Sequence, residues 1–150
     1  MKIAIACDHG GLNLKNEVIK YLKENGYEYK DFGTNSTDSC DYPDFALLAA
    51  EAVAAGECER GIFVCTTGIG ISIAANKVPG VRCALCNEPL SAKMTRLHND
   101  ANSLAIGGGL TGVNLALEIV DTFLNTPFSA EEKHQRRIDK ITAIEKKYSK

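Results

Sequence analysis

The segment Gly61-Ile62-Phe63-Val64-Cys65-Thr66-Thr67-Gly68-Ile69-Gly70 sets the architecture expected of this chain. Its first half is a run of small and apolar residues, which is typical of a strand buried on both faces. A Gly-x-Gly turn follows, and the sequence behind it predicts a short helix near Ser72 to Asn76. A buried strand that turns directly into a helix is a building unit of a parallel sheet.

The same alternation of strand and helix recurs along the chain. Further strands are expected at residues 2–7, 27–31, 81–86 and 103–107. Helices are expected from Leu14 up to a stop at Gly26, at residues 43–55, 88–98 and 111–125, and beyond a capping box formed by Ser129 and Glu132. We therefore predict a single domain over residues 1–150 with a three-layer α/β/α Rossmann-like fold, a five-stranded parallel sheet and an extended C-terminal helix. The last helix carries an apolar stripe that could cover its own domain or reach a partner subunit: Ile138, Ile141, Ile144 and Tyr148.

The composition favours a globular protein without nucleic-acid or membrane partners. Of the 150 residues, 45% are hydrophobic and 24% are charged, and 17 basic against 19 acidic residues give a net charge of −2. A general nucleic-acid binder would show a basic surplus, and no apolar run approaches the roughly 20 residues of a membrane span. Six cysteines in a chain that begins without a signal-peptide pattern indicate reduced thiols. We expect a cytoplasmic protein.

Cys83 and Cys86 form a C-x-x-C pair, a spacing that can signal a zinc or redox site. They lie within the strand expected at residues 81–86, where side chains three apart point to opposite faces of the sheet. We interpret them as two small core residues.

Cys65 is the candidate for the chemical centre. Parallel α/β proteins bind ligands beyond the carboxyl ends of their strands, and Cys65 ends the most apolar strand. The glycine-containing turn that follows lets backbone N–H groups converge, which favours a thiolate or a catalytic oxyanion. The alternative is a structural cysteine above a tight turn. The turn is not a P-loop, because Ile71 and Ser72 follow Gly70 where a P-loop has Lys and Ser or Thr.

Three further segments contain candidate functional residues: two around a histidine and one around a pair of basic residues. His9 follows Asp8 at the end of the first strand, where the pair could act in acid–base chemistry or could only cap a turn. His98, with neighbouring asparagines, suits a sugar whose hydroxyls need donors and acceptors. Lys133 and Arg137 share one face at the start of the last helix, where they could meet a phosphate or could form a solvated face.

The chain resembles the ribose-5-phosphate isomerase B family, a sugar-phosphate isomerase group that includes galactose-6-phosphate isomerase subunits. The resemblance covers nearly the whole chain. It rests on Cys7-Asp8-His9-Gly10-Gly11, Asp41-Tyr42-Pro43, Cys65 to Lys77, Glu88-Pro89, His98-Asn99-Asp100 and His134-Gln135-Arg136-Arg137.

This resemblance implies a metal-independent aldose–ketose isomerase with no cofactor, acting on ribose 5-phosphate and ribulose 5-phosphate through an enediolate. It implies that Cys65 is the base and that His98 is the acid that opens the sugar ring. The implied substrate-binding residues are Asp8, His9, Tyr42, Thr66, Thr67, Gly68, Ile69, Gly70, Asn99, Gly109, Lys133 and Arg137. It also implies a homodimer or homotetramer whose active sites combine residues of two subunits.

Three positions depart from the family pattern. Gly109 and Lys133 stand where the family commonly has arginine, and Thr66 replaces a frequent glycine. Lysine lacks the bidentate geometry of arginine toward phosphate, so we hypothesise weaker phosphate anchoring and some activity on unphosphorylated sugars. The alternatives are a galactose-6-phosphate isomerase-type hexose isomerase and a non-catalytic nucleotide or sugar-phosphate binding module.

Overall fold

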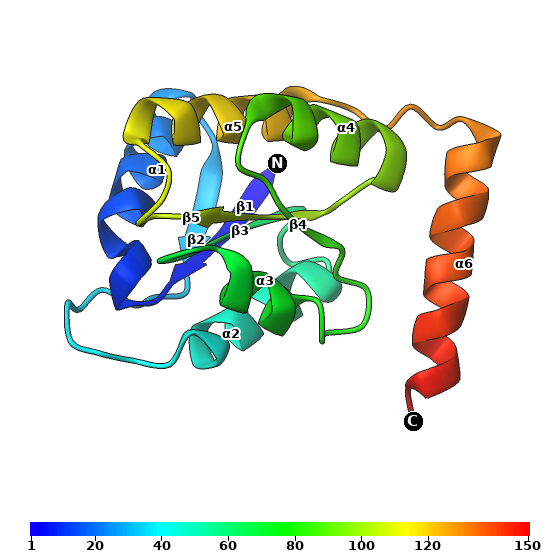
Figure 1. The fold of residues 1–150 in the computed structure, drawn as a ribbon, viewed down its shortest axis with the longest axis horizontal. Helices are drawn as coiled ribbons and strands as arrows, with labels where there is room; N and C mark the ends of the chain where they lie inside the picture. The colour runs from blue at the N-terminus through cyan, green and yellow to red at the C-terminus, as the bar shows by residue number, and fades with distance from the viewer.

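A computed structural model describes residues 1–150 as a parallel sheet between two layers of helices (Figure 1). The strands are β1 (Lys2–Cys7), β2 (Glu28–Asp31), β3 (Arg60–Cys65), β4 (Cys83–Leu85) and β5 (Ser103–Gly107). The helices are α1 (Leu12–Glu24), α2 (Tyr42–Ala54), α3 (Ile69–Ala75), α4 (Pro89–Asn99), α5 (Val113–Asn125) and α6 (Glu132–Tyr148), with a 3₁₀ turn at His9–Gly11. The predicted α/β fold with five parallel strands is confirmed.

The strand order places the switch point of the sheet beside β3. The order is β2-β1-β3-β5-β4 and every pairing is parallel. After β1 the chain moves to one side of the sheet, and after β3 it moves to the other, so the loops behind β1 and β3 diverge. A crevice between diverging loops at the carboxyl edge is where such sheets bind ligands.

Two apolar clusters cover the two faces of the sheet. One cluster joins the side chains of Ile3, Ile5, Ile62 and Val64 to helices α1, α4 and α5. The other joins Phe63 and Ala105 to α2 and α3. Because neighbouring residues of β1 and β3 alternate between the two clusters, both faces of these strands are buried. Their continuous apolar runs follow from that double burial.

The helix α6 lies apart from the rest of the domain, on the side opposite to the loop that follows β5 (Figure 1). Only His134 and Ile138 of this helix are buried, and its contacts with other elements are chiefly with α4. The remaining apolar stripe residues stay exposed: Ile141, Ile144 and Tyr148. Within one chain the stripe therefore does not close over its own domain. No helix is long and apolar enough to cross a bilayer.

Some predicted boundaries were wrong. The helix α3 begins at Ile69 rather than near Ser72, and β4 covers only Cys83–Leu85 rather than residues 81–86. The capping box at the start of α6 does not form. Ala130 has a φ of +57°, which takes the chain out of helical geometry, so Glu131 becomes the N-cap residue.

Candidate active site

Three loops meet at the carboxyl edge of the sheet and are joined by main-chain hydrogen bonds. The N–H of Asp8, after β1, donates to the carbonyl of Val64 at 3.2 Å. The N–H groups of Gly108 and Gly109, after β5, donate to the carbonyls of Cys65 at 2.7 Å and Thr66 at 2.9 Å. These bonds hold the loops behind β1, β3 and β5 in one fixed arrangement around the end of the central strand.

The sulfur of Cys65 borders a cavity at this edge. The cavity has a volume of about 410 Å³ and is lined by Asp8, Tyr42, Cys65, Thr66, Thr67, Ile69 and Gly70. Cys65 is only 5% exposed, yet its side chain contributes to the wall. The sulfur accepts the Gly68 N–H at 3.1 Å. Cys65 thus combines a main-chain donor to its sulfur with a place in the cavity wall, which a cysteine sealed in the apolar core would not have.

Gly68 is required for this hydrogen bond. Its φ of +77° lies in the left-handed region, which residues with a Cβ adopt at a cost. A Cβ there would also lie 2.7 Å from Leu85 Cδ1 and 2.8 Å from the carbonyl carbon of Ile106. The turn thus passes so close to β5 that only glycine fits, and the N–H is aimed at the sulfur by that close approach.

Tyr42 reaches the same cavity from the start of α2. A Cβ on Gly70 would lie 2.6 Å from the Cζ atom of the Tyr42 ring. The Tyr42 ring can therefore pack beside the turn only because Gly70 has no side chain. Tyr42 is 37% exposed and forms part of the cavity lining.

Asp8 and His9 are both anchored through the backbone. The carboxylate of Asp8 accepts the Gly11 N–H at 3.1 Å and caps the 3₁₀ turn, while it also lines the cavity. The Nδ1 atom of His9 accepts the Cys40 N–H at 3.2 Å. This bond leaves Nε2 as the protonated nitrogen of the neutral ring. Sequence reasoning missed Cys40, because its contact with His9 spans 31 positions of the chain.

Two of the departures from the family pattern prove to be coupled. The Cγ2 atom of Thr66 lies 2.8 Å from where a Cβ on Gly109 would be. Thr66 therefore occupies the space that a side chain at position 109 would need. A larger residue at position 109 therefore requires Thr66 to move or to be replaced by a smaller residue, so the residue types at positions 66 and 109 depend on each other.

The other predicted site residues lie at the opposite edge of the sheet. His98 and Asn99 end α4, just before the chain enters the amino end of β5, whereas Cys65 pairs with Gly107 at the carboxyl end. The five residues of β5 alone span about 13 Å. Lys133 and Arg137 are exposed on α6, the helix whose His134 ring stacks against His98. The structure thus brings the predicted residues together in two groups rather than one.

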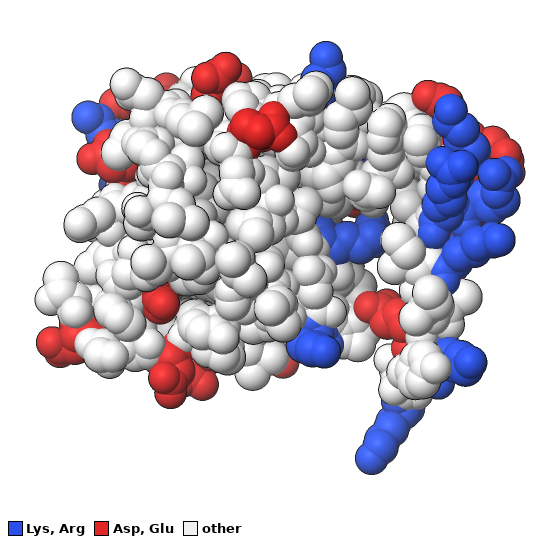
Figure 2. Space-filling model, viewed as in Figure 1, with Lys and Arg blue, Asp and Glu red and all other residues white.

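The second group is cationic and open. Lysine and arginine side chains gather over α6 (Figure 2). Lys133 lies 3.6 Å from Glu131, and both side chains are more than half exposed. The imidazole rings of His98 and His134 stack with their centroids 4.2 Å apart and their planes 17° from parallel. Burial is the largest cause that lowers the pKa of His134, and the nearby His98 lowers it further.

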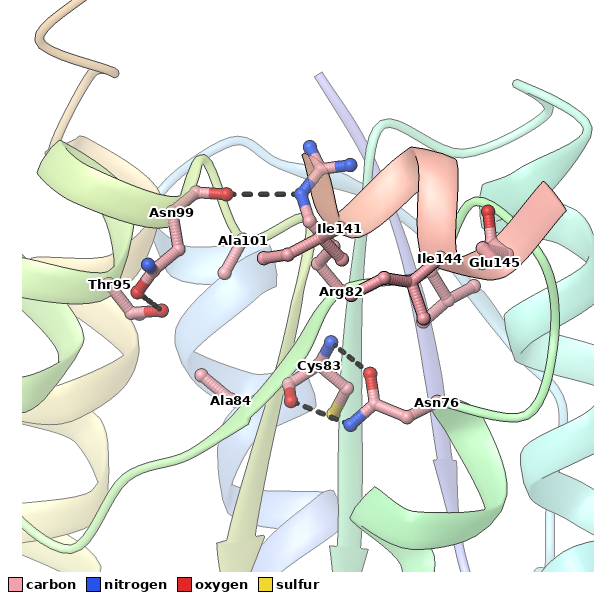
Figure 3. A pocket seen from close by; sticks show the side chains of 11 residues that line it. Asn76, Arg82, Cys83, Ala84, Thr95, Asn99, Ala101, Ile141, Ile144 and Glu145 are labelled. Atoms are coloured by element: carbon pink, nitrogen blue, oxygen red, sulfur yellow. Dashed lines mark hydrogen bonds between the residues drawn. The ribbon is translucent and has the colours of Figure 1, made fainter. Parts of the chain in front are cut away.

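A cavity of about 530 Å³ separates α6 from the rest of the domain (Figures 2 and 3). Ile141 and Ile144 project into it from α6, and Asn99 borders it from α4. On the floor, the side chain of Asn76 pairs with the backbone of Cys83, accepting its N–H at 2.8 Å and donating to its carbonyl at 2.9 Å. The cavity therefore has a mixed lining, with the apolar Ile141 and Ile144 beside Glu145 on α6, and apolar residues beside the polar Asn76 on the domain side.

Cys7, Cys83 and Cys86 pack with the two apolar clusters. Burial raises the pKa of Cys7 to about 12 and that of Cys86 to about 11, and it also raises the pKa of Cys83. Cys83 packs with the α2 and α3 cluster, and Cys86 with the cluster on the other face. The two side chains of the C-x-x-C pair lie on opposite faces of the sheet as predicted, but only Cys86 is a buried core residue, since Cys83 is half-buried and lines the cavity beside α6. No three His, Cys, Asp or Glu side chains are grouped as metal ligands.

Fold and cavity together define a parallel α/β protein with a cysteine sulfur and a main-chain donor facing a small-molecule cavity. The family described as Ribose/Galactose Isomerase matches residues 3–141. Ribose-5-phosphate isomerase B of Escherichia coli (strain K12) is 49% identical over 97% of this chain and 97% of its own length. This chain belongs to the ribose/galactose isomerase family, as its motifs indicated.

Solved structures agree closely. Ribose-5-phosphate isomerase B of Clostridium thermocellum has a TM-score of 0.97 and 58% identity, and the match covers 99% of this chain and 100% of that one. The enzyme of Mycoplasma genitalium, with bound ribulose 5-phosphate, has a TM-score of 0.93 and 41% identity over 97% of this chain and 96% of that one. The predicted family and fold are thereby confirmed.

Proposed function

We propose that this protein interconverts ribose 5-phosphate and ribulose 5-phosphate in the cytoplasm, with Cys65 as the base. The observation that carries the proposal is the Cys65 sulfur at the cavity wall with the Gly68 N–H directed at it. Relatives named ribose-5-phosphate isomerase B match this chain over nearly their full length, and this similarity supports the proposal.

The reaction needs a base, a site for an oxyanion and a ring-opening acid. His98 gives a proton to the ring oxygen of the furanose while the anomeric hydroxyl loses its proton to solvent, and cleavage of the bond between carbon 1 and the ring oxygen frees the aldehyde. The Cys65 thiolate then takes the proton from carbon 2, and the electron pair moves onto the carbonyl oxygen. Main-chain N–H groups of the turn from Thr66 to Gly70 stabilise this enediolate. The hydroxyl proton on oxygen 2 then passes to oxygen 1, carbon 1 takes the proton back from the Cys65 thiol, and the product is the ketose.

The rest of the proposed site binds the substrate. Asp8, His9, Tyr42 and Asn99 contact the sugar and the phosphate, and Lys133 and Arg137 bind the phosphate. No step calls for a resident metal ion or organic cofactor. We therefore expect turnover of ribose 5-phosphate to persist in the presence of a chelator, and loss of turnover on chelation would contradict the mechanism.

We also propose that each active site combines two copies of the chain. Cys65 and His98 lie at opposite edges of one sheet, so one molecule cannot apply both to one sugar. The exposed apolar residues Ile69 and Ile73 of α3 adjoin the Cys65 loop. If the α3 helix of a second copy enters the cavity beneath α6, its Cys65 loop approaches His98. Burial of the exposed residues on α3 and α6 would drive this association.

Mixing two inactive variants tests this arrangement. A dimer of Cys65→Ala and His98→Ala chains has one site with both changes and one site with neither. When the variants exchange subunits at random, we expect about a quarter of wild-type activity to return. A mixture no more active than its separate components would place the whole site within one chain. Assays of wild type and Cys65→Ala alone give the baseline for the isomerase proposal itself.

The phosphate end of the substrate should be held loosely. Gly109 offers no cation and Lys133 offers a point charge rather than a bidentate fork. We expect kcat/KM for ribose 5-phosphate to exceed that for a free hexose by less than in relatives with arginine at both positions. Lys133→Arg and the double change Thr66→Gly with Gly109→Arg should widen the ratio. Gly109→Arg alone should not, because Thr66 fills its space. A ratio already as large as in arginine-bearing relatives would refute weak anchoring.

A hexose-phosphate isomerase is the second candidate function. It is supported by the family to which the chain belongs, which is named for galactose as well as ribose. A panel of pentose and hexose phosphates separates the two. A binding module without turnover is the third alternative. It requires that Cys65→Ala keeps ligand affinity while the wild type shows no isomerisation.

A further inference from the structure

His134 is a buried titratable residue to which the proposed mechanism gives no role. Its side chain is 6% exposed, and with Ile138 it forms the only buried part of α6. Its ring lies flat against the ring of His98, 4.2 Å away between centroids. Since the two rings meet face to face, they cannot hydrogen-bond to each other, and packing alone fixes their relation.

The surroundings of the pair favour an uncharged His134. Two imidazolium rings in contact would repel each other, and Lys133 and Arg137 add positive charge on the same helix, with only Glu131 to oppose them. Burial and these charges lower the pKa of His134. A neutral His134 can cover one face of His98 while His98, which is exposed, keeps its edge free to carry a proton.

We propose that His134 is a positioning residue for the ring-opening acid: it packs against one face of His98 and thereby sets the direction in which the His98 ring edge meets the substrate. This inference rests on the proposed function, because it assumes that His98 opens the sugar ring. A ring that is free to rotate on the end of α4 would spend most of its time misaligned, and small misplacements of a catalytic group lower rates strongly.

The two directions of the reaction separate positioning from other roles. Ribose 5-phosphate is a closed furanose and needs ring opening. Ribulose 5-phosphate is an open chain, because its phosphate blocks the hydroxyl that would close the ring. Exchange of its carbon 1 proton with deuterated water needs only the transfer of that proton to Cys65 and back. An acid that only opens rings has no part in this exchange.

The experiment compares His134→Ala, which removes the stacked ring, with His134→Phe, which keeps a flat ring, and with Gln135→Ala as a control. Gln135 is exposed and donates to Asp139 on the outer face of the same helix. Turnover of ribose 5-phosphate and exchange into ribulose 5-phosphate, followed by proton NMR, are measured for each intact protein. We expect His134→Ala to lower kcat for ribose 5-phosphate by about ten- to a hundred-fold, with exchange and the KM for ribulose 5-phosphate within about twofold of wild type. His134→Phe should retain most of the turnover.

Two results would overturn the proposal. If turnover and exchange fall together in His134→Ala, the residue only anchors α6 and its phosphate-binding side chains. If neither falls, the stack has no role. Failure of the proposed function looks different: the wild type would not isomerise ribose 5-phosphate, or Cys65→Ala would still exchange the proton of ribulose 5-phosphate.

Discussion

Replacement of Gly68 by alanine should damage both stability and catalysis, and the structure allows the two effects to be sized. The φ of +77° costs a residue with a Cβ about 1–2 kcal/mol. The new Cβ would also lie 2.8 Å from the carbonyl carbon of Ile106 and 2.9 Å from the nitrogen of Gly107, both of them backbone atoms of β5. Overpacking of this kind adds about 1–3 kcal/mol.

The catalytic effect follows from the shift that relieves the contact. Moving the turn away from β5 lengthens the 3.1 Å hydrogen bond from the Gly68 N–H to the Cys65 sulfur. A hydrogen bond to a charged group is worth about 1.5–3 kcal/mol, and each 1.4 kcal/mol is about a factor of ten in rate. We expect kcat for ribose 5-phosphate to fall by about ten- to a hundred-fold.

Gly26 supplies a matched control. Its φ is +75°, but nothing lies within 4 Å of the Cβ position. Gly26→Ala therefore carries the conformational cost alone, about 1–2 kcal/mol, and should leave kcat unchanged. Urea unfolding and steady-state kinetics on the two variants measure both effects. If Gly68→Ala loses no more stability than Gly26→Ala and keeps its kcat, the close approach to β5 does not aim the N–H at the sulfur.

Three further predictions concern buried polar groups. Lys15 is fully buried and donates to Asp31 at 2.8 Å and to the carbonyl of Thr34 at 2.6 Å. Lys15→Met should lower the free energy of unfolding by about 3 kcal/mol, whereas the same change at the exposed Lys30 should barely move the urea midpoint. Equal effects of the two substitutions on the urea midpoint would contradict this prediction. Burial raises the pKa of the Cys7 thiol from 9.0 to about 12, so its contribution to stability is complete below pH 9 and is lost between pH 9 and 12; the urea midpoint should be lower at pH 10 than at pH 7.5, and Cys7→Ala should reduce that difference. Iodoacetamide at pH 8 should leave Cys7 and Cys86 unmodified in the folded protein, and mass spectrometry that finds either one labelled as fast as in urea would show that they are not held in the core.

Much of the fold could be predicted from local sequence patterns. Apolar runs identified β1, β3 and β5, because burial on both faces requires apolar residues whatever the sheet order is. The edge strand β2, with the sequence Glu-Tyr-Lys-Asp, is at most half-buried and carries a weaker signal. The capping box at Ser129 failed because the backbone of Ala130 depends on how the chain leaves α5. The burial of Lys15 in the inner face of α1 was not anticipated, since its partner Asp31 lies 16 positions further along the chain, at the end of β2.

The candidate site was predictable as a set of residues but not as an arrangement. A strand end, a glycine turn and histidines beside carboxylates or asparagines are visible in the sequence, because each reflects chemistry among neighbours in the chain. The separation of Cys65 from His98 and the stack of His98 on His134 depend on strand order and on the path of α6. Such relations join residues tens of positions apart, and no local pattern records them. Local sequence patterns were enough to predict the helices, the strands and the reactive side chains. Which of those side chains face one another depends on the packing of the whole domain, because that packing sets the distances between them.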